Sequence, residues 1–189
     1  MKKYIGTLIA GVTLMAGFPV VGHAADQKTT ADVSLTQDEL NKDVTLDQAP
    51  SVDFGSNVRD NGTVTYSAKS ITDAIKVTNP GNTDGWQVSV SRTGFTTTDA
   101  QALKGELLKF GTAAVTPDDD QNASTRPTAH EITINNAPQA ILTANAKEGI
   151  GKFTATHAND QITLVVPAGN VAGAYKSTLT WTLANTPEA

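Results

Sequence analysis

Apolar and polar side chains alternate along much of this chain, most clearly near its end. From Tyr175 to Leu183, tyrosine, serine, leucine, tryptophan and leucine alternate with lysine and threonines. Residues two apart lie on one face of an extended chain, so this pattern predicts a strand with one buried and one solvated face. The stretch from Trp86 to Val90 alternates in the same way. Each of the two tryptophans is therefore expected in a half-buried strand.

Further strand-like segments recur between these two regions and before them. Turn-forming residues such as Asn61-Gly62 separate nearly all of the segments, and no sustained helical period is present. Residues 98–108 fit a short helix and a strand about equally well, because Gly105 interrupts the helical pattern. The pattern predicts an all-β fold, an antiparallel β-sandwich in a single domain. The expected strands are Thr63–Ser67, Ala74–Thr78, Trp86–Arg92, Leu103–Phe110, Glu131–Ile134, Ile141–Asn145, Gly151–Thr156, Gln161–Val166 and Tyr175–Ala184.

The beginning of the chain has the order of a secretory signal peptide. Lys2 and Lys3 precede an apolar stretch that ends at the small residues Gly22-His23-Ala24. Glycines and Pro19 within this stretch weaken the alternative, a transmembrane anchor. We expect cleavage after residue 24, secretion, and no membrane span in the exported protein. A polar, partly mobile leader is expected at 25–50, with short strands at 34–36 and 44–46 as an option, and the sandwich at 51–189.

Charge and cysteine content restrict the classes of function. The chain has 14 basic and 19 acidic residues, a net charge of -5, and loss of Lys2 and Lys3 with the signal peptide leaves 12 against 19, or -7. No lysine or arginine cluster is present, which argues against nucleic acid as a partner. There is no cysteine, so disulfides, thiol catalysis and thiolate metal sites are excluded.

The residues around the two tryptophans resemble the small members of the WxL-domain family, surface proteins of low-GC Gram-positive bacteria. Trp181-Thr182-Leu183 matches the distal W-x-L motif in full, whereas Trp86-Gln87-Val88 matches the proximal one with valine in place of leucine. The resemblance extends from about Ser51 to the end of the chain. The resemblance also rests on four further segments: Val52-Asp53-Phe54-Gly55, the segment from Ile75 to Gly81, Gly149-Ile150-Gly151 and the segment from Leu164 to Gly169.

The resemblance implies a β-sandwich on the cell wall surface, outside the cell, held there without a covalent bond. Within these 189 residues there is no L-P-x-T-G motif and no lipobox cysteine, which agrees with that expectation. The implied partner is peptidoglycan or another wall component. The alternative is a subunit of a multi-protein surface complex, whose ligand is a membrane-anchored companion or a larger WxL protein.

Candidate chemistry is sparse, and we expect no enzyme activity, no catalytic residue, no metal and no cofactor. His130-Glu131 lacks the second histidine of a zinc-protease helix, since position 134 is Ile134. The acidic run from Asp118 to Asn122 lacks the glycine and glutamate of a calcium loop, and a solvated loop is expected. His157 is expected to be a solvated turn residue.

The candidate binding residues are those of the motif: Trp86, Val88, Tyr175, Trp181 and Leu183. Two interpretations stand side by side. Outward-facing tryptophans would stack on sugar rings or anchor a protein partner. Inward-facing ones would serve as core residues, which the alternation favours because each shares a face with valines or leucines. Tyr175 is the additional candidate, because its ring can pack while its hydroxyl reaches solvent.

Overall fold

A computed structural model describes residues 29–38, 42–58 and 61–185. The expected signal peptide lies outside the described residues. The chain divides into two units, residues 1–35 and residues 36–189. The described part of the first unit, residues 29–35, has exposed side chains and no helix or strand. Everything below concerns the second unit.

The second unit is built from antiparallel β-strands, and the residues described contain no α-helix. One four-stranded sheet has the order β1-β5-β12-β8, a second β14-β6-β11-β9 and a third β10-β7-β13-β3, and β2 pairs with β4. A single turn of 3₁₀ helix, η1 (Asn159–Gln161), lies between β12 and β13. The strands are β1 (Thr45–Gln48), β2 (Ser51–Asp53), β3 (Val64–Ser67), β4 (Ser70–Thr72), β5 (Ile75–Asn79), β6 (Trp86–Arg92), β7 (Leu107–Phe110), β8 (Ala114–Pro117), β9 (Thr128–Ala129), β10 (Ile132–Ile134), β11 (Gln139–Ala144), β12 (Gly151–Thr156), β13 (Ile162–Val166) and β14 (Leu179–Ala184).

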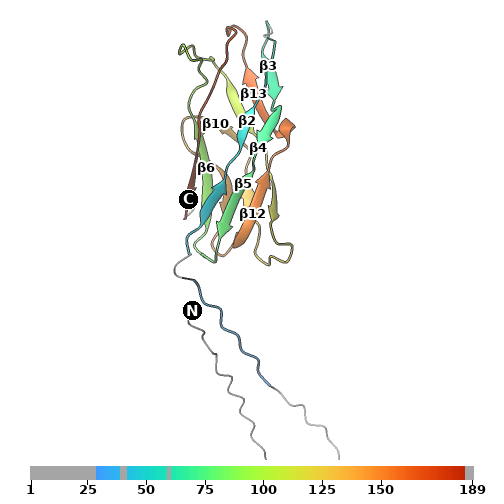
Figure 1. The fold of residues 1–189 in the computed structure, drawn as a ribbon, viewed down its shortest axis with the longest axis vertical. Coiled ribbons are helices and arrows are strands. Elements are labelled where there is room, and N and C mark those ends of the chain that lie inside the picture. The colour runs from blue at the N-terminus through green and yellow to red at the C-terminus, as the bar shows by residue number, and fades with distance from the viewer. Residues whose placement is uncertain (1–28, 39–41, 59–60, 186–189) are drawn as a thin grey trace, which may run out of the picture. The chain divides into compact units, whose positions relative to one another are not determined.

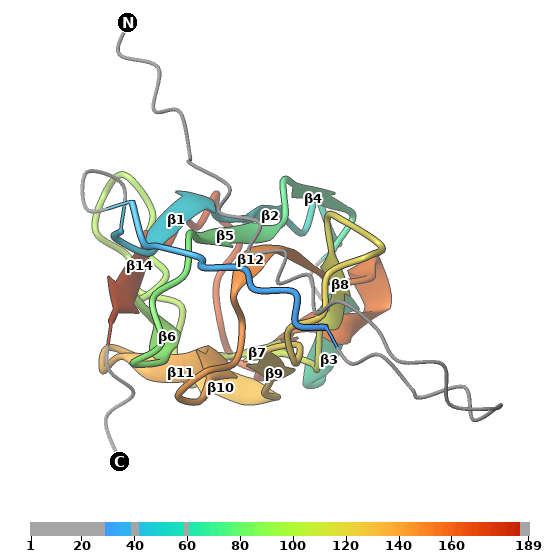
Figure 2. The ribbon, with the colours of Figure 1, turned by 90° about the horizontal axis from the view of Figure 1, so that it is seen from below.

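The sheets pack face to face around one apolar core, which confirms the predicted β-sandwich. In Figure 1 β5 and β12 run side by side, and Figure 2 shows β1 and β5 on one side of the fold with β6 and β11 on the other. Alternate residues of these strands point inward. The largest fully buried side chains are Trp86, Phe110, Phe153, Ile75, Leu108, Ile134, Ile141, Leu142, Ile162, Val77, Val88 and Val90.

Most predicted strands are present, and two have the predicted bounds, Trp86–Arg92 and Gly151–Thr156. The ambiguous stretch 98–108 contains no helix and forms β7 only from Leu107 onward. The optional strand at 44–46 exists as β1, which pairs with β5, and Val44 is buried beside it. The end of the expected leader is thus part of the sandwich, whereas 34–36 is not a strand.

The expectation for His157 is wrong. This residue follows β12 directly, and its side chain is only 6% exposed. Its ring meets the Phe110 ring edge-on, with 5.3 Å between the centroids. Turns at sheet ends often expose their residues, but the turn that follows β12 directs the His157 side chain toward Phe110.

Candidate functional site

The structure brings the two tryptophan motifs together on neighbouring strands. β14 runs antiparallel to β6 and places Leu183 opposite Val88 and Trp181 opposite Val90. Four of the candidate residues, Trp86, Val88, Trp181 and Leu183, therefore belong to one cross-strand cluster. On the other face of β14, threonines at 180 and 182 are exposed, as the alternation predicts.

Trp86 and Val88 lie wholly inside the core. Both are 0% exposed. The Trp86 indole Nε1 donates a hydrogen bond of 3.2 Å to the Gly149 carbonyl, which satisfies its one polar group in the interior. A ligand outside the fold cannot touch either side chain, so their role is to support the structure.

Trp181 and Leu183 are half-buried and pack on the core from its edge. The Trp181 ring meets Phe110 in a T-shaped arrangement, with centroids 6.2 Å apart. Among the described strands, β14 is hydrogen-bonded to β6 alone and is the edge strand of its sheet. Trp181 is therefore partly accessible at this edge of the sandwich.

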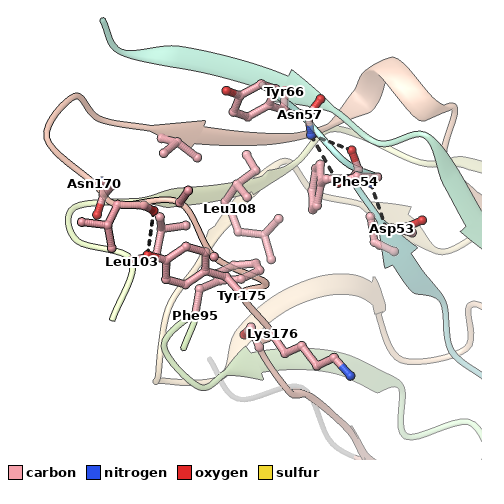
Figure 3. A pocket seen from close by; sticks show the side chains of 18 of the residues that line it. Asp53, Phe54, Asn57, Tyr66, Phe95, Leu103, Leu108, Asn170, Tyr175 and Lys176 are labelled. Atoms are coloured by element: carbon pink, nitrogen blue, oxygen red, sulfur yellow. Dashed lines mark hydrogen bonds between the residues drawn. The ribbon is translucent and has the colours of Figure 1, made fainter. Parts of the chain in front are cut away.

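Tyr175 lies apart from that cluster, in the segment that leads into β14. Its hydroxyl donates a hydrogen bond of 3.0 Å to the Val171 carbonyl, and its half-buried ring lines a groove of about 530 Å³. Three further aromatic rings line the same groove: Phe54, Tyr66 and Phe95. Figure 3 shows these rings arranged around the apolar side chains of Leu103 and Leu108.

The groove is assembled from segments far apart in the sequence. Phe54 follows β2, Tyr66 lies in β3, and Leu108 in β7. Leu164 and Val166 of β13 add to the apolar lining. The third sheet supplies the floor because the alternate residues of its strands point inward, and the loops at its end supply the walls.

Hydrogen bonds fix the turn that carries Phe54. The Asp53 carboxylate accepts a hydrogen bond from the Gly55 amide at 2.9 Å. The Asn57 side-chain amide donates to the Phe54 carbonyl, also at 2.9 Å (Figure 3). Gly55 has φ 67°, a left-handed conformation that glycine adopts without strain. The turn is thus held by its own short polar side chains.

The opposite wall is fixed by Asn170 and by paired backbone segments. Asn170 accepts from the Lys104 amide at 2.7 Å and donates to the Lys104 carbonyl at 3.0 Å. Thr96 and Lys176 exchange two backbone hydrogen bonds of 2.9 Å, and the Leu103 amide donates to the Phe95 carbonyl. These bonds fix the backbones that carry Phe95 and Tyr175.

Of the candidate residues, only Tyr175 reaches this groove, and sequence reasoning did not select the other three rings. One signal was present, because Phe54 and Phe95 each adjoin a glycine, at Phe54-Gly55 and Gly94-Phe95. An aromatic residue beside a turn glycine lies at the end of a strand, where loops gather. Strand periodicity alone does not show which strand ends meet.

Histidine and acidic side chains are scattered over the described part of the chain. No group of three or more histidine, aspartate or glutamate side chains lies together among residues 29–38, 42–58 and 61–185. Asp118 accepts a hydrogen bond from Thr154, and Asp119 caps the turn at Gln121. No helix in this part of the chain is long and apolar enough to cross a membrane.

Comparison with known proteins gives one family. A family model described as "WxL domain surface cell wall-binding" matches residues 24–187. No curated protein and no solved structure matches the chain. The matched residues include both tryptophan motifs and all strands of the sandwich.

Proposed function

The chain belongs to the WxL-domain family of surface domains that bind the cell wall, and from this premise we propose that it is a non-catalytic protein held on the wall of a Gram-positive cell by non-covalent binding to peptidoglycan. We further propose that residues 1–24 are a cleaved signal peptide and that the protein acts outside the cell. The observation that carries the proposal is the extent of the family match. It spans residues 24–187, which supports the assignment of wall binding to this fold as a whole.

The burial of the motif residues divides their roles within this proposal. Trp86 and Val88 are fully buried and contribute to binding by stabilising the strands. Trp181 and Leu183 fasten the edge strand β14 to the core. Tyr175 is the motif-associated residue whose ring lines a groove, and it is the one we assign to ligand contact.

The test is co-sedimentation of the purified exported protein with peptidoglycan freed of proteins and teichoic acids. Wild type is expected to pellet with the peptidoglycan. Trp86→Ala is expected to lose binding together with the circular dichroism of the fold, because deletion of a buried tryptophan costs about 3–5 kcal/mol. A folded wild type that stays in the supernatant would contradict peptidoglycan binding.

A second function is favoured by the position of β14. Within the described part of the chain this strand is hydrogen-bonded on one side only, to β6. A sheet edge of this kind can accept a strand from another protein. The protein would then be a subunit of a surface complex with a membrane-anchored companion or a larger WxL protein. In that case a folded protein would pellet with peptidoglycan only after the companion is added.

A further inference from the structure

We propose that the groove lined by Phe54, Tyr66, Phe95 and Tyr175 is a binding site for a neutral N-acetylated amino sugar of the wall glycan. This inference rests on the proposed function, and it names both the site and the part of the wall that the site contacts. The aromatic rings of the groove, and not the motif tryptophans, would then make the contact with sugar.

The size and lining of the groove fit a short length of glycan. Its volume of about 530 Å³ lies within the range of small-ligand sites. Such sites combine an apolar lining with a few placed polar groups. The leucines at 103, 108 and 164 offer an apolar floor for an acetyl methyl group. The rings above them offer faces for the C–H side of a pyranose.

The rings are held in place before any ligand arrives. Tyr175 is fixed by its hydrogen bond to the Val171 carbonyl, and Phe54 by the turn that Asp53 and Asn57 stabilise. The guanidinium of Arg92 lies over the Phe95 ring, 5.5 Å from its centroid. A preformed site loses little conformational entropy on binding, which favours a weakly interacting ligand such as a sugar.

The charges around the groove balance. Asp53 and Lys176 are the two ionisable acid and base groups that line it, one of each sign. Lys176 lies at the rim, and its ammonium points away from the rings (Figure 3). Asn57 and Ser177 add side-chain oxygens that can accept a hydrogen bond, while their donors are engaged with backbone carbonyls. A phosphate polymer would need several cations, whereas a neutral sugar needs only such hydrogen-bonding groups.

The location argues against a peptide strand as the occupant. The groove lies over the loops and inward-facing side chains at the end of the third sheet, and the segment at its rim, residues 175–177, already pairs with residues 93–96. A peptide that binds by strand addition uses a free row of backbone donors and acceptors at a sheet edge. At this rim Lys176 already exchanges two backbone hydrogen bonds with Thr96, so the rim offers no free row.

The decisive experiment titrates the exported protein with a soluble N-acetylglucosamine tetramer and follows binding by calorimetry. Wild type is expected to bind. Phe54→Leu and Phe95→Leu are each expected to weaken binding by about 3- to 10-fold, the range for loss of one aromatic contact. The matched control is Phe153→Leu, the same change at a buried ring outside the groove, which is expected to lower stability and leave affinity unchanged.

Other outcomes overturn the proposal. Absence of tetramer binding by folded wild type does so, as does equal weakening by Phe153→Leu. Binding of free peptidoglycan stem peptide instead of the tetramer would assign the groove to a peptide. Pelleting with whole peptidoglycan is scored separately: a folded Phe54→Leu/Phe95→Leu double variant that pellets like wild type would remove the groove assignment and leave the proposed function standing.

Discussion

At Gly149 the backbone passes so close to the Trp86 indole that no side chain fits between them. A Cβ atom there would lie 2.9 Å from Trp86 Nε1 and 2.7 Å from the Ala144 Cβ. The same glycine accepts the hydrogen bond from the indole and has φ 62°. The proximal motif tryptophan therefore depends on a glycine 63 residues further along the chain.

Replacement of Gly149 by alanine should destabilise the fold through both strain and overlap. We expect a loss of about 2–5 kcal/mol, the sum of left-handed backbone strain and overpacking. Gly169→Ala is the matched control, because Gly169 has φ 83° but open space around its Cβ position, and about 1–2 kcal/mol is expected. Urea unfolding measures both. Equal losses would show that contact with Trp86 contributes nothing.

His157 is a titratable group in the core. Burial lowers the pKa of its imidazole, and an interaction with the Gly111 backbone raises it by less. Its Nε2 is buried and has no hydrogen-bond partner in the described part of the chain. The neutral ring is thus the form that the folded state holds.

This burial makes stability depend on pH in a defined direction. The unfolded chain takes up a proton near the ordinary pKa of 6.5, and the folded chain only at lower pH. The free energy of unfolding is therefore highest above about pH 6.5 and falls as the pH decreases toward the lowered pKa. In His157→Leu the urea midpoint of unfolding should change less between pH 7.5 and 5.5 than it does in wild type. In His130→Leu, at an exposed histidine, the midpoint should change with pH as in wild type, and the reverse result would contradict the assignment.

At the scale of elements, one ion pair links the end of β6 to the segment before β7. Arg92 and Glu106 lie 2.8 Å apart, with side chains 9% and 10% exposed. The Arg92 Nε also donates to the Ile134 carbonyl at the end of β10, at 2.9 Å. Three elements thus meet at one guanidinium, which also covers the Phe95 ring of the groove.

Glu106→Gln should cost about 3 kcal/mol, because it leaves the nearly buried Arg92 without its counter-charge. The matched control is Glu131→Gln at an exposed site, with an expected change within about 0.5 kcal/mol. Replacement of both partners by methionine should cost less than the single change, since no unpaired charge is left. Chemical denaturation of the four proteins decides the point. If Glu106→Gln were as stable as wild type, the ion pair would contribute nothing to the free energy of unfolding.

The long alternating strands were predictable from sequence, and the short ones were not. β6 and β12 carry a strong two-residue period, so even their ends were correct. β8 reads locally as part of a polar loop, yet Thr116 pairs with Thr154 of β12 across 38 residues. Such strands form because a neighbour offers backbone partners, which is a tertiary effect. The groove could not be predicted from sequence either, because Phe54 and Tyr175 line the same groove only in the folded chain.

At the scale of the whole molecule, the negative charge sets the conditions under which binding should be observed. The chain carries a net charge of -5. On the Gram-positive wall that we propose as its location, the protein would meet anionic polymers. Like charges repel over a distance that salt shortens. The aromatic groove, with one charge of each sign, should be little affected by salt.

The salt dependence should therefore distinguish binding to peptidoglycan itself from repulsion by the anionic polymers around it. Binding to intact walls is expected to increase several-fold between 10 and 150 mM salt, roughly as screening at these ionic strengths requires. Binding to peptidoglycan stripped of anionic polymers should change less than about twofold, because no anionic polymer is left to repel the protein. Sedimentation at both salt levels measures this. Weaker binding to stripped peptidoglycan at higher salt would indicate an ionic contact outside the groove.

The place of β14 in the chain bears on the export that we propose for this protein. Its Thr182 hydroxyl contacts the Ser89 carbonyl across 93 residues, and β14 covers one side of β6 (Figure 1). Pairings so distant in sequence form late and slowly. The strand β6 gains its partner on this side only after β14 has been synthesised. In the export that we propose, such a delay would leave the polypeptide unfolded for longer, which is the state that a secretion channel can transport.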